Sequence, residues 1–175
     1  DQCASLLAEA NRRRLIASQP VADSEGSCPL HNVVRVANFG SVTLSSSFLA
    51  SCPLALSSAL YVEQQAKPLT RQLMASDLRQ IDHLGSFACR NIYHRQQARR
   101  SEHATADALD VSGFRLADGR RVSVLQGWRS ETSHPWLAAL LNNSCHYFGN
   151  ALGPEYNAAH ANHFHLGMRG QGFCF

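Results

Sequence analysis

Two short segments of the chain carry the residues that could do chemistry. The first holds His163 and His165, which stand on either side of Phe164. In a strand, residues two apart point to the same face, so the two imidazoles would lie side by side while Phe164 packs on the other face. One imidazole of such a pair can bind a cation while its neighbour stays free for proton transfer. The alternative interpretation is an ordinary surface histidine pair without a metal.

The second segment runs from Ser101 to Asp110 and reads SEHATADALD. His103 offers a neutral nitrogen ligand, and Asp110 offers a carboxylate oxygen. Asp110 lies at an apolar strand start, where burial of an unpaired carboxylate would cost several kcal/mol, so it needs a cation or another partner. In the alternative interpretation that partner is an arginine, and His103 is an exposed loop residue.

Together the two segments supply three protein ligands, His103, Asp110 and His165. Three ligands with an open fourth position are typical of catalytic zinc, whereas structural zinc is usually closed by four. Zinc lowers the pKa of its bound water from about 15.7 to about 7, which makes hydroxide available at neutral pH. His163 could then deprotonate that water or hydrogen-bond the tetrahedral intermediate. The sequence has no HExxH segment, which excludes the thermolysin arrangement.

The elements around these residues favour an α+β fold in a single domain over residues 1–175. We expect a small antiparallel β-sheet core that carries the zinc site, flanked by helices and cross-linked by disulfides. Residues 1–27 are predicted to form an N-terminal helix and loop extension, and residues 28–175 the core. Helices are predicted at 4–16, 54–65 and 134–148. Strands are predicted at 31–38, 41–44, 78–84, 87–92, 108–116, 121–125 and 163–168, with a hairpin turn at 117–119.

The cysteines are spread along the whole chain, at Cys3, Cys28, Cys52, Cys89, Cys145 and Cys174. No CxxC pair occurs, which disfavours a thiolate zinc site and favours three disulfides in an oxidising compartment. Pairing neighbours along the chain would close the shortest loops. It predicts the bridges Cys3–Cys28, Cys52–Cys89 and Cys145–Cys174. A chain that opens at Asp1 also looks like a mature product whose leader has been removed.

Composition and charge exclude several classes of protein. Hydrophobic residues make up 45% and charged residues 17% of the chain, so it is neither disordered nor a membrane protein. No apolar run approaches the roughly 20 residues that span a bilayer. The net charge of +3 is too small and too scattered to indicate nucleic acid as a partner. It is compatible with an anionic surface such as a cell wall.

The stretches SEHATADALDVSGF, LGPEYNAAHANHFHLG and FACRN resemble the extensin-like C-terminal domain family of bacteria. That family in turn resembles the LAS metallopeptidases, which share the pattern SxHxxGxAxD followed by HxH. The resemblance spans roughly residues 25 to 175. It implies that His103, Asp110 and His165 bind one zinc ion and that His163 is the catalytic histidine.

The same resemblance implies roles for three further residues. His160 matches a histidine that lines the cleft in a subgroup of murein endopeptidases. Arg90 falls where related enzymes carry an arginine near the substrate carbonyl, and it would stabilise the oxyanion; the alternative is a surface ion pair. Ser101 matches a serine that contacts the substrate peptide, although it could instead cap the following turn.

Two positions depart from the family pattern. Ala106 stands where the motif has glycine, and it would strain the loop if that position has a positive φ. Gly167 stands where the family often has aspartate after HFHL, so a carboxylate that supports a zinc ligand is expected to be missing.

These observations predict a periplasmic or secreted zinc peptidase that hydrolyses peptidoglycan stem peptides or cross-links at or next to D-alanine. Deployed as an antibacterial toxin, it would also have an immunity or delivery partner. One alternative is a non-catalytic zinc-containing module that binds the cell wall, although the extra imidazole of His163 argues against a purely structural site. Another is a wall-associated disulfide-rich scaffold without a metal.

Overall fold

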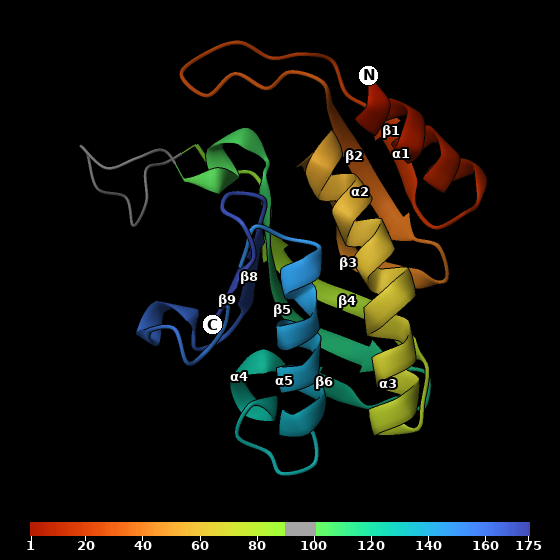
Figure 1. The fold of residues 1–175 in the computed structure, drawn as a ribbon, viewed down its shortest axis with the longest axis vertical. Coiled ribbons are helices and arrows are strands. Elements are labelled where there is room, and N and C mark those ends of the chain that lie inside the picture. Colours follow the sequence, from red (N-terminus) through yellow and green to blue (C-terminus); the bar gives the residue numbers. More distant parts are fainter. Residues whose placement is uncertain (90–100) are drawn as a thin grey trace.

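The computed structural model describes residues 1–89 and 101–175 as a single α+β domain (Figure 1). Its helices are α1 (Gln2–Arg12), α2 (Cys52–Tyr61), α3 (Lys67–Met74), α4 (Val124–Gly127) and α5 (His134–Asn143). A π-helical turn, η1 (Val62–Ala66), joins α2 to α3. Short 3₁₀ turns are η3 (Glu102–Thr105), η4 (Ser144–His146) and η5 (Ala158–His160).

The described strands form one mixed sheet in which most neighbours are antiparallel. The strands are β1 (Ala17–Pro20), β2 (Val33–Phe39), β3 (Val42–Ser51), β4 (Leu78–Gly85), β5 (Ala108–Leu116), β6 (Arg121–Ser123), β7 (Asn150–Leu152), β8 (Phe164–Gly167) and β9 (Phe173–Cys174). Their order is β1-β2-β3-β4-β5-β8-β7-β9, with β6 paired to β5. The parallel pair of β3 and β4 is connected by the helical segment from α2 to α3.

Helices α2, α3 and α5 lie together against the sheet, and the main core lies between them and the strands (Figure 1). Helix α2 begins where the Ser51 hydroxyl accepts a hydrogen bond from the backbone nitrogen of Leu54, with a proline in the first turn. Trp136 of α5 is fully buried, and its indole nitrogen donates to Thr70 Oγ1 of α3 at 3.1 Å. This contact ties the two helices together in the core.

Burial alternates along the first part of β5, the central strand for the site. Leu109 and Val111 are buried in the core, whereas Asp110 and Ser112 are only partly buried. Because alternate side chains of a strand point to opposite faces, the hydrophobic pattern that packs β5 on the core also turns Asp110 away from it. Packing and site placement therefore follow from the same alternation.

Most of the predicted elements are confirmed, with shifted ends, but α3, β7 and β9 were not expected, and two further segments differ. Residues 87–89 form no strand, and 90–92 lie outside the described residues. Strand β4 pairs with β3 and β5 on its two sides, which leaves no place for a hairpin partner after Gly85. Residues 17–20, expected within a loop, form β1 and pair with β2. Helix α1 buries Leu7 and Ala10, so the first 27 residues also contribute to the core.

All six cysteines form disulfides, and two of the three predicted pairings are wrong. The bridges are Cys3–Cys52, Cys28–Cys89 and Cys145–Cys174, of which only the last was expected. Helix α1 packs on α2, which brings Cys3 to the first residue of α2. Packing between elements, and not loop length, therefore decides the pairing.

Among the described residues, no helix is long and apolar enough to cross a membrane.

Candidate metal centre

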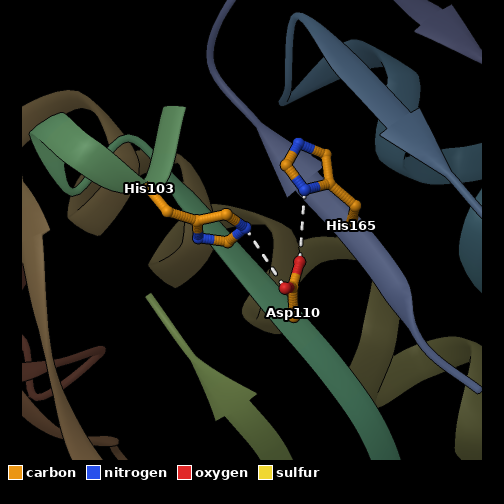
Figure 2. Close-up of side chains that lie close together, drawn as sticks. All are labelled: His103, Asp110 and His165. Carbon is orange, nitrogen blue, oxygen red and sulfur yellow. Dashed lines mark hydrogen bonds and ion pairs between the residues drawn. The ribbon is translucent and has the colours of Figure 1, made fainter. Parts of the chain in front are cut away.

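The sheet register brings Asp110 and His165 together. Strands β5 and β8 are antiparallel, and Asp110 lies directly opposite His165. Side chains in such a pair are close neighbours on one face of the sheet. His165 Nδ1 lies 3.1 Å from Asp110 Oδ1 (Figure 2).

His103 reaches the same carboxylate from the turn η3. The Ser101 hydroxyl caps this turn by accepting a hydrogen bond from the backbone nitrogen of His103 at 3.2 Å. The turn ends at Ala106, which has φ of 56° and ψ of 37°. His103 is 4% exposed, and its Nε2 lies 3.1 Å from Asp110 Oδ2. The left-handed backbone at Ala106, which costs an alanine about 1–2 kcal/mol, therefore lies in the loop that holds a candidate ligand.

Each of these two histidines uses its other ring nitrogen to bind an oxygen of the protein. His103 Nδ1 lies 2.7 Å from the carbonyl oxygen of Ser86, and it must donate because a carbonyl only accepts. His165 Nε2 donates to Glu102 Oε1 at 2.9 Å. Histidines that bind metals are oriented by such acceptors, which fix the tautomer and the ring plane.

His103 Nε2, a carboxylate oxygen of Asp110 and His165 Nδ1 consequently converge on one region. One ligand atom from each residue lies within 4.8 Å of the others. Figure 2 shows the two imidazoles turned toward the carboxylate from different elements. Two imidazole nitrogens and one carboxylate oxygen form a donor set that suits a divalent transition metal such as zinc. The three residues can hold a metal ion.

Buried hydrogen bonds shift the pKa values of these groups in the metal-free protein. Burial by itself would raise the pKa of Asp110, but hydrogen bonds from His103 and His165 hold it well below its usual range. Burial would lower the pKa of His165, but its hydrogen bonds to Asp110 and Glu102 outweigh burial and raise it to about 9. The pKa of Glu102 is lowered, because its hydrogen bonds, first of all from His165, outweigh burial.

His163 lies beside the three candidate ligands without being one of them. Its Nε2 lies 3.8 Å from Asp110 Oδ1, and its side chain is 14% exposed. Its Nδ1 makes a hydrogen bond of 2.8 Å to Asn162 Oδ1. Phe164, the residue between the two histidines, is 2% exposed and packs in the core as the strand alternation predicts.

His160 lines the same region from η5. Its ring lies 5.0 Å from that of His163 between centroids, and its Nδ1 is 2.7 Å from Asn157 Oδ1. Burial, together with the neighbouring His163 and His165, lowers its pKa to about 4. His160 is therefore neutral at neutral pH, and Tyr156 packs edge-on against its ring.

The contacts of residues 101–110 decide between the alternative interpretations of that segment. Within the described residues, the ion-pair partners of Asp110 are histidines and not arginines. His103 is buried, so it is not an exposed loop residue. Ser101 is also buried, and it caps η3, which agrees with the interpretation of this serine as a cap of the following turn. The predicted oxyanion contact of Arg90 lies outside the described residues.

Glu102 is the residue of the site that the sequence interpretation missed. It stands between Ser101 and His103 inside the quoted motif, and a glutamate there suggests an ordinary solvated charge. In the structure Glu102 is only 8% exposed, and its carboxylate accepts a hydrogen bond from His165. No signal in the sequence pairs positions 102 and 165, because they belong to different elements.

An open groove of about 410 Å³ lies along the sheet, and its described lining holds neighbours of the candidate ligands but none of the ligands themselves. Its lining includes Ser112, two residues beyond Asp110 on β5, and Asn162, which hydrogen-bonds His163. Arg115 and Arg121 also line it. Arg115 is paired with Asp82 at 3.2 Å, whereas no carboxylate of the described residues pairs with Arg121.

Comparison with known proteins matches the chain to a family model. The family model described as the C-terminus of extensin-like proteins matches residues 1–175, which is the whole chain. The match therefore includes both segments that form the metal centre. No match was found among the curated proteins or the solved structures.

Proposed function

We propose that this chain, which belongs to the extensin-like C-terminal family, is a zinc-dependent peptidase that hydrolyses peptidoglycan stem peptides or their cross-links. The observation that carries the proposal is the convergence of His103 Nε2, the Asp110 carboxylate and His165 Nδ1, with a further imidazole beside them. A structural zinc site would use four closed ligands and would need no additional histidine. The resemblance of the SxHxxxxAxD and HxH segments to the LAS metallopeptidases supplies the reaction class.

Bound zinc would act as a Lewis acid and supply hydroxide at neutral pH. The protein's part is to hold the ligands in place and to move a proton. His163 is suited to proton transfer because its Nδ1 is held by Asn162 while its Nε2 faces Asp110 at 3.8 Å. His160, which is buried and has a pKa lowered to about 4, presents a neutral imidazole next to His163 at neutral pH.

The groove along β5 supports a peptide substrate. It is open, and its lining carries serine, asparagine and arginine side chains, of which Asn162 hydrogen-bonds His163. Peptidoglycan stem peptides carry free carboxylates, and a guanidinium such as that of Arg121 is suited to bind them. We propose that the stem peptide lies in this groove with its scissile bond next to His163.

The three disulfides fit an oxidising compartment, which is where peptidoglycan is exposed to such an enzyme. A periplasmic or secreted location is therefore part of the proposal. The wall-binding module without catalysis remains the competing function, and only an assay for product separates the two.

The test is digestion of purified, cross-linked muropeptides by the zinc-loaded protein, with products identified by mass spectrometry. We expect products cut at or next to D-alanine. His163→Ala should keep zinc but lose roughly 10²–10⁴-fold in rate, because a positioned acid–base group contributes that much. His146→Ala, which removes an exposed histidine of η4, is the matched control and should retain full activity. A zinc-loaded native protein that releases no product would contradict the proposed peptidase.

A further inference from the structure

The Glu102 carboxylate occupies the space next to Gly167 in which a side chain would lie. A Cβ built on Gly167 would lie 2.4 Å from Glu102 Oε1 and 2.5 Å from Glu102 Oε2. Contacts under 3.0 Å essentially never occur for real Cβ atoms, so a side chain at 167 would force the Glu102 carboxylate out of its present position. The space that a side chain at position 167 of β8 would fill is therefore occupied by the side chain of Glu102, which belongs to η3.

The Glu102 carboxylate is fixed by donors to both of its oxygens. Oε1 accepts from His165 Nε2 and from Asn150 Nδ2, each at 2.9 Å. Oε2 accepts from the backbone nitrogen of Arg169 at 2.7 Å. A carboxylate can accept hydrogen bonds at both oxygens. An amide in its place would have an NH₂ group facing one of these three N–H donors, and that hydrogen bond would be lost. The surroundings therefore select a carboxylate and not merely a polar side chain.

We propose that Glu102 is the positioning residue of the metal centre and that the missing side chain at Gly167 makes room for it. By accepting the Nε2 hydrogen of His165, Glu102 keeps Nδ1 as the ligand nitrogen and fixes the plane of the ring. This inference rests on the zinc site of the proposed function, but it does not depend on the reaction that the site performs.

The geometry also predicts that the substitution Gly167→Asp can compensate for the loss of Glu102. The distances of 2.4 and 2.5 Å from the Gly167 Cβ to the Glu102 oxygens are close to the separation of Cβ and a carboxylate oxygen within an aspartate. In a chain without Glu102, Gly167→Asp would therefore place an acceptor next to His165 Nε2. With Glu102 present, two carboxylates would compete for one buried space.

The experiment measures zinc affinity by competition with a chromophoric chelator, on whole protein with its disulfides intact. Glu102→Ala and the isosteric Glu102→Gln should each bind zinc about 10–100-fold more weakly, which is the usual effect of losing the partner of a ligand histidine. Gly167→Asp alone should also bind more weakly and unfold at a lower temperature. The double variant Glu102→Ala/Gly167→Asp should recover affinity relative to Glu102→Ala. Asp107→Asn, which removes a neighbouring carboxylate bonded to Thr105, should bind like the native protein.

Thermal unfolding in excess chelator shows whether each variant is folded without metal. If Glu102→Ala does not fold, the comparison is made between Glu102→Gln and the double variant. Native zinc affinity in both Glu102 variants would overturn the inference and leave the zinc site standing. A double variant no better than Glu102→Ala would overturn the steric replacement at Gly167. A native protein that binds no zinc would overturn both the inference and the metal site.

Discussion

Raising the pH should destabilise the metal-free protein, because His165 is held as a cation between two carboxylates. Its Nδ1 lies 3.1 Å from Asp110 Oδ1 and its Nε2 lies 2.9 Å from Glu102 Oε1. These contacts raise its pKa from 6.5 to about 9 in the folded protein. Folding therefore increases the proton affinity of this residue, and protonation in turn favours the folded state.

The direction and size of the effect follow from the two pKa values. The stabilisation is fully present below about pH 6.5, the unfolded value, and is lost as the pH rises through about 9. At about 1.4 kcal/mol for each pH unit between the two values, the loss is on the order of 3 kcal/mol. That is a large fraction of the roughly 5–15 kcal/mol by which domains are typically stable. His160, whose folded pKa is lowered to about 4, acts only below this window and in the opposite direction.

The assay is urea unfolding between pH 6 and about pH 9.5 in excess chelator, with the disulfides intact. The free energy of unfolding of the native protein should fall across the window. It should fall much less in His165→Gln, which has no proton to lose. His31→Gln is the matched control, because His31 also contacts a carboxylate, Asp23 at 3.2 Å, but is exposed. A native profile that is flat, or that has the slope of His165→Gln, would refute the assignment of His165 as the buried cation.

Two further predictions concern the metal and the disulfides. About one zinc per chain should co-purify, and His103→Ala, Asp110→Ala and His165→Ala should each lose most of it by elemental analysis; full zinc in all three would exclude this ligand set. In the unfolded, unreduced protein a thiol reagent should find no free cysteine, and removing Cys28–Cys89 by a double Ser substitution should cost about 2–5 kcal/mol in urea unfolding. Two or more titratable thiols would contradict the presence of three disulfides.

Features with a local signal could be predicted from the sequence. The hairpin of β5 and β6 has an Asp-Gly turn between alternating runs, and it forms as expected. The ligand candidates could be chosen because His103, Asp110 and His165 are residue types that bind metals and their two segments together resemble the LAS pattern, although each segment alone also allowed an ordinary interpretation. The alternation around Phe164 also predicted which side chain packs and which ones face the site.

The ends of elements were predicted less well, and the reason is again local. The strand expected at 121–125 stops at Ser123, whose hydroxyl accepts from the Gln126 backbone nitrogen and begins α4. The helix expected at 54–65 continues through η1 to Met74, because the backbone stays right-handed helical at Ala66 and Lys67, and it ends where Ala75 adopts the left-handed conformation. A capping hydroxyl decides the first of these ends and a left-handed residue decides the second, and neither position stands out in the sequence.

The sequence by itself determines which side chains can bind a metal and how many cysteines are available for bridges. It also determines the alternation that turns Asp110 away from the core. Which distant partners meet depends on the folded chain. The antiparallel register sets Asp110 opposite His165, and a shift of one residue would turn one of them to the other face. The packing of α1 on α2 selects Cys52 as the partner of Cys3. Glu102 accepts a hydrogen bond from His165 in the space that a side chain at Gly167 would occupy, and such complementarity exists in space and not along the chain.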